Sequence, residues 1–349
     1  MMRLKLLLLA VATLAAAPGM AHTYYVGKCK SGAYSTIQSA VNGVPAGSTI
    51  EVCPGIYPEQ VIIDKALTLE GIPNYDTGPV VITDVGVSLT TTTSIYWGTI
   101  APQIQVTAGP VNITNINVTE NNGPACPGLE IAIFYASGSS GTVKGVVTNG
   151  NCHLGSVGIA AENGAGASQS VTIEDSQIQA GSNAGISIGS DQIPSSLSAE
   201  VRNNFLWTNP TGVMSLGNVQ GSIINNSITS YPPGGTGVWA GSANVAVSGN
   251  WVAQQNIGID IEGTAVSVTS NQIFNTAITG INIGVDGVTV KSNSIAYSVN
   301  SAIEFNCTTG DTVTANIINS ADLGLDKVPT GFTGSNTFYN VGTKTTGGC

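Results

Sequence analysis

Charged residues are scarce in this 349-residue sequence. They make up 9% of the chain, and ten lysines and arginines stand against twenty aspartates and glutamates, for a formal net charge of −10. A surface of that sign repels nucleic acid and anionic membranes. It also disfavours tight binding of a polyanionic glycan, unless Ca²⁺ bridges the two. We therefore expect no nucleic-acid partner.

Long apolar runs are absent except at the start of the chain. There, Arg3 and Lys5 precede an apolar stretch at 6–17 and small residues at 19–21. This is the pattern of a secretory signal peptide, and the stretch is shorter than the ~20 residues that cross a bilayer. We predict a signal peptide at 1–21, a secreted or periplasmic protein and no membrane insertion. Cleavage would remove Arg3 and Lys5 but no acid, which lowers the formal charge to −12.

Histidine is rare, with two residues in the chain, and a Cys-x-x-Cys motif is absent. A metal centre built from these residues is therefore not expected. An even number of cysteines in an exported chain suggests disulfides instead. The cysteines fall into three sequence-local pairs, so we favour 29–53, 126–152 and 307–349 among the possible pairings. They are Cys29, Cys53, Cys126, Cys152, Cys307 and Cys349.

What the sequence does contain is a repeat. In the second half, segments such as VSGNWVA, VTSNQIF and VKSNSIA recur every 21 to 24 residues. A fixed period of this size is the signature of a solenoid. We expect one asparagine per row to occupy the same corner of each coil, to adopt the left-handed conformation and to hydrogen-bond to its neighbours. The aligned asparagines are Asn203, Asn226, Asn250, Asn271, Asn293 and Asn316.

Each row also has a second block in which apolar and polar residues alternate, such as GIDI at 258 and GINI at 280. This alternation is strand periodicity, and no row has room for a helix. Each row is therefore predicted to be one coil of about three short strands, stacked in parallel ~4.8 Å from the next. A single coil cannot bury its own apolar face, so the stack is the domain. We predict one β-solenoid domain at 22–349.

A solenoid needs a cap over its open end, and AYSTIQSAVNGV provides a candidate. Ile37 and Ala40 belong to an apolar helical face. Ser35 and Gln38 have the spacing of a capping box. We predict an N-terminal capping helix at 35–44.

The segment after this cap carries a family resemblance. TIQSAVNGVPAGSTIEVCPGIYPEQVIIDKALTLEGI at 36–72 resembles the first coil of pectin methylesterases and related proteins of the pectin-lyase-like superfamily. The later rows are similar to the repeats of periplasmic NosD-like proteins. The resemblance implies an all-β, single-stranded right-handed parallel β-helix. It implies no particular activity, because lyases, hydrolases, esterases and binding proteins share this architecture.

The outward positions of the second block carry the candidate site. If Ile259 and Ile261 face the core, their neighbours face solvent, on the strand that the resemblance implies is the wall of a substrate groove. Asp260 and Glu304 would lie two coils apart, ~9.6 Å, near the upper end of the separation in inverting glycosidases. Glu304 and Asp326, one coil apart, fit the separation in retaining glycosidases better. We predict as catalytic residues Asp260, Glu304 and Asp326, and as substrate-binding residues Trp239, Glu262, Asn282 and Asn306.

Other interpretations stay open. Outward positions of a solenoid are normally polar, so these acids could simply be solvent-exposed residues of a scaffold without a binding site. Closely spaced oxygens could hold Ca²⁺, although no cofactor is otherwise expected. GIDI resembles part of a polygalacturonase strand, but the NTD, GHG and RIK motifs are missing, and so are recognisable motifs of pectin methylesterases. Pectate lyases need a basic residue, and Arg202 lies on another strand, where a surface charge is expected.

One segment breaks the repeat, namely SLTTTTSIYWGTIAPQ at 88–103. Loops of this size on a rigid scaffold often carry specificity, so we expect it to lie over the groove. Trp97, Trp207 and Trp251 are candidates for exposed aromatic residues.

These patterns together predict an exported β-helix protein that binds an extracellular polysaccharide along an acidic and aromatic strand face. Processing of the bound polysaccharide is an open extension of this prediction. A non-catalytic, adhesin-like surface β-helix is the first alternative. A divergent glycoside hydrolase or pectinesterase-like enzyme is the second.

Overall fold

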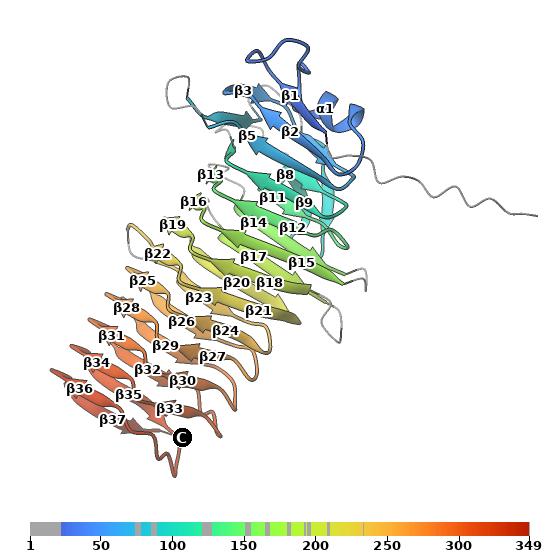
Figure 1. The fold of residues 1–349 in the computed structure, drawn as a ribbon. Coiled ribbons are helices and arrows are strands. Elements are labelled where there is room, and N and C mark those ends of the chain that lie inside the picture. The colour runs from blue at the N-terminus through green and yellow to red at the C-terminus, as the bar shows by residue number, and fades with distance from the viewer. Residues whose placement is uncertain are drawn as a thin grey trace, which may run out of the picture.

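The chain folds into one elongated stack of coils (Figure 1). The structure is a computed structural model. Coil order along the stack follows chain order, and helix α1 lies at the N-terminal end. The residues that the structure describes are 22–73, 78–84, 89–120, 128–150, 155–164, 168–179, 183–191, 193, 197–207, 210–232 and 234–348.

Three parallel sheets, here called A, B and C, form the walls of the stack, and from β2 to β35 each coil contributes one strand to each sheet in the order A, B, C. In sheet A the strands are β1 Thr23–Val26, β2 Ser48–Val52, β5 Leu67–Gly71, β9 Val111–Thr114, β12 Gly141–Lys144, β15 Gln169–Glu174, β18 Leu197–Arg202, β21 Val219–Ile224, β24 Val245–Ser248, β27 Ser267–Thr269, β30 Thr289–Lys291 and β33 Thr312–Thr314.

Sheet B contains the shortest strands, most of them three residues long. They are β3 Gly55–Pro58, β6 Val80–Thr83, β10 Asn117–Thr119, β13 Val147–Asn149, β16 Gln177–Gln179, β19 Phe205–Trp207, β22 Ser227–Thr229, β25 Trp251–Ala253, β28 Gln272–Phe274, β31 Ser294–Ala296, β34 Ile317–Asn319 and β36 Thr337–Tyr339.

Sheet C has longer strands in its N-terminal half, and β7 Thr92–Ser94 pairs with its second strand in antiparallel fashion. Its own strands are β4 Val61–Ile63, β8 Gly98–Val106, β11 Leu129–Tyr135, β14 Ser156–Asn163, β17 Ala184–Ser190, β20 Thr211–Gly217, β23 Thr236–Ala240, β26 Ile257–Ile261, β29 Thr279–Ile283, β32 Ser301–Phe305, β35 Leu323–Val328 and β37 Thr343–Gly347.

The core follows from the alternation along each strand. Ile259 pairs in register with Ile281, which pairs with Ile303, and all three are fully buried between the sheets. Burying one such side chain stabilises the fold by roughly 1.5–3 kcal/mol relative to leaving it exposed. The stack therefore holds together through continuous apolar columns that no single coil could bury.

The N-terminal end is closed by helix α1 (Ile37–Gly43), which packs on β1, β2 and β4. The predicted capping box of Ser35 and Gln38 is wrong by one residue, because Thr36 is the N-cap and Ser39 completes the box. The side chain of Gln38 instead pairs with the backbone of Ile62 on edge strand β4, donating at 3.2 Å and accepting at 2.7 Å. This contact protects an exposed sheet edge.

A ladder of buried asparagines runs along the corner between sheets A and B. In each step the side-chain Nδ2 donates to the next asparagine's Oδ1 at 2.9–3.0 Å. Two details differ from the expectation. The ladder starts at Asn204 rather than Asn203, and from Asn204 to Asn316 the left-handed residue is the one before the ladder asparagine, for example Asn225 with φ +54°. The ladder residues are Asn204, Asn226, Asn250, Asn271, Asn293, Asn316 and Asn336.

The disulfide prediction is confirmed for one pair. Cys29 and Cys53 are bonded, with a Cα–Cα distance of 5.7 Å, and the bond ties the first coil to the second strand of sheet A. Cys307 is also disulfide-bonded. Cys126, Cys152 and Cys349 lie outside the described residues, so the 126–152 and 307–349 pairings stay predictions. The proposed signal peptide at 1–21 lies outside them as well.

Within the described part of the chain, no helix has both the length and the apolar character needed to cross a membrane.

Candidate functional site

The outer face of sheet C carries the column that the sequence predicts. Strand pairing sets Trp239 opposite Asp260, Asp260 opposite Asn282, Asn282 opposite Glu304, and Glu304 opposite Asp326. Their side chains point away from the core because the isoleucines that alternate with them point inward. Five residues from five coils thus form one straight row, spaced by about 4.8 Å per coil.

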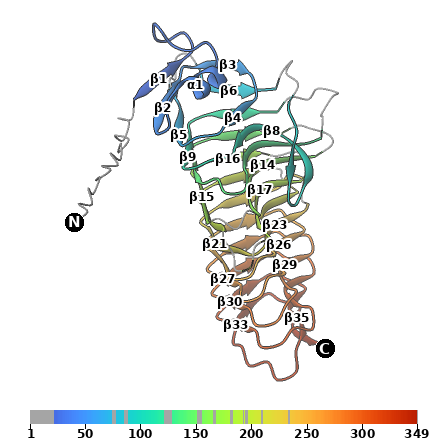
Figure 2. The ribbon, with the colours of Figure 1, turned by 90° about the vertical axis from the view of Figure 1, so that its right-hand side faces the viewer.

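The N-terminal half of this face is covered by the hairpin of β7 and β8, which lies against the neighbouring coils (Figure 2). Phe134, Ala160 and Met214 are the outward residues there, and the hairpin buries them in a second small apolar cluster. Trp97 packs on this cluster, and its Nε1 donates to Ser187 Oγ at 3.3 Å. The expectation that the 88–103 segment lies over this strand face is therefore correct for residues 94–97, whereas residues 98–103 belong to β8 of the sheet itself. The open part of the face begins at Trp239.

A buried carboxylate anchors the hairpin. Glu162, at the end of β14, is 1% exposed and accepts hydrogen bonds from Ser94 Oγ at 2.5 Å and from the backbone N–H of Ile95 at 2.7 Å. Burial raises the pKa of Glu162, and these hydrogen bonds lower it in part. Burial also raises the pKa of Tyr96 to about 12, and the nearby charges of Asp191 and Glu162 add to the shift. The hairpin is thus a fixed wall of the open face.

The open half holds a chain of polar contacts. Asn282 Nδ2 donates to Asp260 Oδ1 at 2.8 Å, and Asn306 Nδ2 donates to Asn282 Oδ1 at 3.1 Å. Glu262 and Asn306 each follow directly after a strand of sheet C and lie beside the main column. The structure therefore joins three of the predicted residues by hydrogen bonds, and the fourth, Glu262, lies beside them.

Two carboxyl groups on this surface have perturbed acidity. Burial raises the pKa of Asp260, against the lowering effect of the hydrogen bond from Asn282. Partial burial of its carboxylate, together with the charge of Asp260, raises the pKa of Glu262. Gly284 makes room for this second carboxylate, since a Cβ there would lie 2.7 Å from Glu262 Oε1. Carboxyl groups with raised pKa values are suited to proton transfer near neutral pH.

The two C-terminal acids of the column are engaged differently. Lys327 Nζ lies 2.6 Å from Glu304 Oε1, and Thr279 Oγ1 donates to Glu304 Oε2 at 3.1 Å. Asp326 accepts from the hydroxyl of Thr346 and from the backbone N–H of Lys327. Glu304 and Asp326 are neighbours as predicted, but a cation and a hydroxyl already occupy them.

Trp239 stands where the covered and the open halves meet. Its ring is partly buried against the apolar cluster under the hairpin. Its indole Nε1 is buried and makes no hydrogen bond within the described residues. An indole N–H normally finds a partner when it is buried, so among the described residues this donor is an unsatisfied polar group beneath the surface, and a ligand at the start of the open face can reach only the exposed part of the ring.

Sequence reasoning missed two buried acids at the corner between sheets B and C. Glu120 and Glu130 are 1% and 2% exposed, and neither oxygen of Glu120 has a hydrogen-bond partner among the described residues. Burial raises the pKa of Glu120 well above its ordinary value and that of Glu130 to about 7, with the charge of Asp84 adding to both. The signal was available, because Glu120 continues the inward alternation of β10 after Val118.

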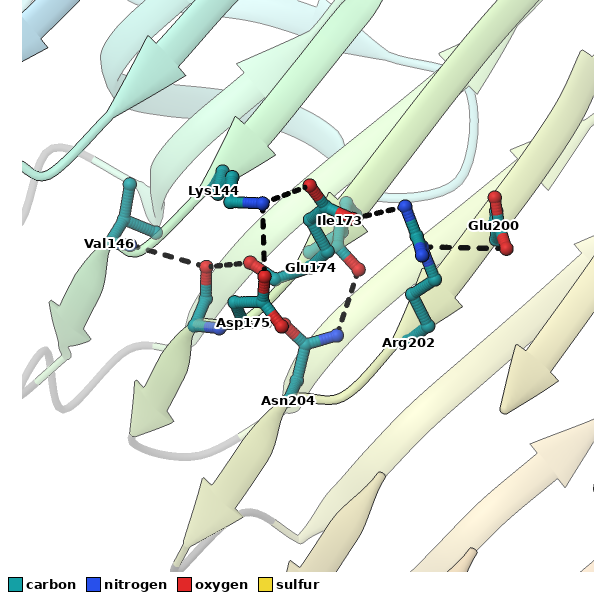
Figure 3. Close-up of polar contacts among 9 residues, drawn as sticks. Lys144, Val146, Ile173, Glu174, Asp175, Glu200, Arg202 and Asn204 are labelled. Carbon is teal, nitrogen blue, oxygen red and sulfur yellow. Dashed lines mark hydrogen bonds and ion pairs between the residues drawn. The ribbon is translucent and has the colours of Figure 1, made fainter. Parts of the chain in front are cut away.

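Arg202 lies on sheet A, away from the column, and has a structural role (Figure 3). Its guanidinium pairs with Glu174 and, through Nε at 3.4 Å, with Glu200. Lys144 reaches Glu174 from the other side at 2.9 Å and also pairs with Asp175 at 3.1 Å. The largely buried Glu174 thus sits between two cations, and Arg202 is a charge in a surface network, as expected.

Within the described residues, no three or more histidine, cysteine, aspartate or glutamate side chains gather in a way that could hold a metal ion. The open face of sheet C therefore offers paired acids, amides and one indole ring rather than a preformed metal centre.

Comparison with known proteins bears on the fold. No family model matches the sequence, and no curated relative matches it. Among solved structures, the A-module of a mannuronan C-5 epimerase from Azotobacter vinelandii is similar with a TM-score of 0.63 and 12% identity, over 88% of this chain and 91% of that one. The catalytic domain of a GH87 α-1,3-glucanase in complex with tetrasaccharides has a TM-score of 0.64 and 14% identity, over 92% and 65%.

The Dettilon tailspike protein is also similar, with a TM-score of 0.59 and 14% identity over 86% of this chain. This chain spans 63% of the tailspike chain. Identities this low show a shared fold alone. Together with the parallel three-sheet stack, they show that the chain has the right-handed parallel β-helix fold.

Proposed function

We propose that this protein is exported and binds an extended polysaccharide on the open half of sheet C's outer face. One observation carries the proposal. Trp239, Asp260 and Asn282 stand in strict register on successive coils, so a ring, a carboxyl group and an amide repeat along one line. An extended glycan presents hydroxyl groups and apolar ring faces along a line in the same way.

The structural neighbours support carbohydrate as the partner. A mannuronan epimerase module, an α-1,3-glucanase domain and a tailspike protein share the fold. At 12–14% identity they do not transfer a substrate to this chain. They make polysaccharides the first ligand class to test.

We assign the binding contacts from chemistry. Trp239 is placed to stack the exposed part of its ring on a sugar ring. Asn282 and Asn306 can each accept and donate to hydroxyl groups. Glu262 accepts from sugar hydroxyls when it is ionised. The covered N-terminal half leaves a bound chain no room beyond Trp239, so the glycan runs toward the C-terminal coils.

If the protein also processes its ligand, Asp260 is the proposed proton donor, because burial raises its pKa. Glu304, two coils and about 9.6 Å away, is near the separation of a general base in inverting enzymes. Asp326 is one coil further on. To act as the base, Glu304 accepts a proton either with the ammonium group of Lys327 still in contact or after that contact breaks.

A second candidate is binding without catalysis. The specific observation behind it is the engagement of Glu304 by Lys327 and of Asp326 by Thr346. A carboxylate held by a cation is a weak base and a firm structural contact. In this candidate the same face binds the glycan and leaves it intact.

The experiment is a panel of neutral and uronic-acid polysaccharides, with and without Ca²⁺. Retention in affinity gels and release of reducing or unsaturated ends are measured for the wild type, Asp260→Asn and Trp239→Ala. Retention that both variants weaken supports the site, and product release that Asp260→Asn abolishes adds catalysis. If neither variant weakens the retention of any polysaccharide in the panel, the site is not on sheet C.

A further inference from the structure

Sheet B differs from the rest of the molecule in its charge. Among its twelve described strands, no residue is an aspartate, glutamate, lysine, arginine or histidine. Sheets A and C both carry acids and bases in their strands, for example Glu200 and Lys291 in sheet A. An acidic chain thus keeps one long face electrically neutral.

The same face carries exposed aromatic rings. Phe205 and Trp207 on β19 are 44% and 46% exposed, Trp251 on β25 is 41% exposed, and Phe274 on β28 is 43% exposed. Further along, Tyr339 on β36 is 55% exposed. A single exposed apolar residue is common on protein surfaces, but several exposed rings on one uncharged face mark a candidate interaction surface.

The rings are arranged by the coil repeat. Phe205 and Trp251 belong to one outward column and lie two coils apart, about 9.6 Å. Trp207 and Phe274 belong to the neighbouring column and lie three coils apart, about 14 Å. Tyr297 packs edge-on against Phe274, with ring centroids 5.1 Å apart, and holds that ring in place. The platform from Trp207 to Tyr339 spans six coil steps, about 29 Å.

A shallow hollow lies at the N-terminal end of the platform. It has a volume of about 100 Å³ and is bounded by Phe205 and Trp207. Asn149, Gln177 and Gln179 line the rest of it with amides, and the Oδ1 of Asn149 is buried without a hydrogen-bond partner among the described residues. The hollow combines apolar walls with a few convergent polar groups, which is the composition of a ligand site.

We propose that the outer face of sheet B, from Trp207 to Tyr339, is a second binding surface for an uncharged, extended polysaccharide. Pyranose rings stack their C–H faces on Trp207, Trp251 and Phe274, while hydroxyl groups pair with the amides between the rings. Each pyranose lengthens an extended chain by a distance close to one coil step. Sugar rings two and three units apart can therefore meet aromatic side chains two and three coils apart. This surface is separate from the proposed site on sheet C.

The neutrality of the face decides the partner. Nucleic acid and acidic glycans need cations that the described strands of sheet B do not provide. A lipid surface would leave the amides of Gln177, Gln272 and Asn319 without partners, which is costly, whereas sugar hydroxyls satisfy them. A second copy of the chain would bring the same row of rings and amides against itself, and that outcome is included in the test.

The test is binding of the full chain to four insoluble neutral polysaccharides, namely regenerated cellulose, β-1,4-xylan, β-1,4-mannan and α-1,3-glucan, with polygalacturonate as the charged comparison. The test variant is Trp207→Ala/Trp251→Ala/Phe274→Ala. Ile278→Ala is the control for an exposed apolar side chain outside the strands of sheet B, because Ile278 is 42% exposed and directly precedes β29 of sheet C, and Trp239→Ala reports on sheet C. Circular dichroism verifies the fold, which should persist because the substituted rings are exposed.

We expect retention on at least one neutral polysaccharide that does not change between low and high salt. The triple variant should bind at least about tenfold more weakly, while Ile278→Ala and Trp239→Ala bind as the wild type does. No retention on any neutral polysaccharide, or retention lost only with Trp239→Ala, overturns the proposal. Sedimentation is the further measurement. If the wild type is a dimer, the triple variant is a monomer and neither is retained on a neutral polysaccharide, the face serves self-association, and the proposal is overturned too. Because sheet C is tested by its own variant, failure here leaves the proposed function standing.

Discussion

The asparagine ladder makes the stability of this fold testable at a single residue. Asn271 is fully buried at the middle of the ladder. Its Nδ2 donates to Val247 O at 2.9 Å and to Asn293 Oδ1 at 3.0 Å. Its Oδ1 accepts from the backbone N–H and from Nδ2 of Asn250, both at 2.9 Å. Asn271→Ala deletes these four hydrogen bonds and leaves a buried backbone N–H without a partner.

The magnitude follows from these contacts. A typical hydrogen bond contributes about 1 kcal/mol net, so losing four lowers the free energy of unfolding by about 4 kcal/mol. Globular proteins are stable by only ~5–15 kcal/mol in total, so the loss is large. Asn306→Ala is the matched control, because Asn306 is exposed and its side chain makes one hydrogen bond. It should cost about 0.5 kcal/mol or less.

The assay is urea denaturation followed by far-UV circular dichroism. The midpoint should fall strongly for Asn271→Ala and little for Asn306→Ala. The slope is compared as well, since a changed slope signals coils that unfold separately. A loss below about 1 kcal/mol, or equal losses in the two variants, would refute the reasoning that the ladder holds the corner between sheets A and B.

Three further predictions follow from buried or paired groups. Because burial holds the pKa of Glu130 at about 7 against an ordinary 4.5, the folded state binds the extra proton, and stability should fall by about 3 kcal/mol as pH rises from about 4.5 to 7. Glu130→Gln should remove this pH dependence of the free energy of unfolding, and it should stabilise the protein at pH 8 but not at pH 4. The exposed control Asp64→Asn should have neither effect. Arg202→Gln leaves Glu174 paired with Lys144 alone and should lower the free energy of unfolding, measured in denaturant, by about 1–2 kcal/mol. Lys65→Gln should change it by nearly nothing, and equal effects of the two substitutions would contradict a stabilising role of the network. Trp97→Ala should cost about 2 kcal/mol and open residues 89–99 to limited proteolysis, and unchanged protease resistance would show that Trp97 does not hold the hairpin.

Much of the fold could be predicted because the coil repeat is visible as alternation. The inward isoleucines and the outward column of sheet C both follow from it. The ladder position could not be fixed in the same way, because VRNNFLW holds two adjacent asparagines. Which one points inward depends on the left-handed conformation of Asn203, φ +56°.

The site was predicted less completely than the fold. Alternation places Glu304 outward but says nothing of Lys327. The backbone of Lys327 is left-handed, with φ +54°, at a register shift in β35. Its ammonium group contacts Glu304. The covering of Phe134 and Met214 by the hairpin depends on contacts between residues far apart in the chain. Periodicity carries no information about such contacts.

The polar groups of the open face suggest how the chain would read a glycan. The acids favour hydroxyl donors and disfavour carboxylates, so Ca²⁺ dependence would appear only with uronic-acid chains. Neutral chains should bind equally well with and without Ca²⁺. This difference separates the two ligand classes within one polysaccharide panel.

The most direct measurement is a crystal structure of the protein with an oligosaccharide cut from a polysaccharide whose retention Trp239→Ala weakens. The account predicts a sugar ring over Trp239 and sugar hydroxyls within hydrogen-bond distance of Asp260 and Asn282. An oligosaccharide found only elsewhere, with the open face of sheet C empty, would contradict it.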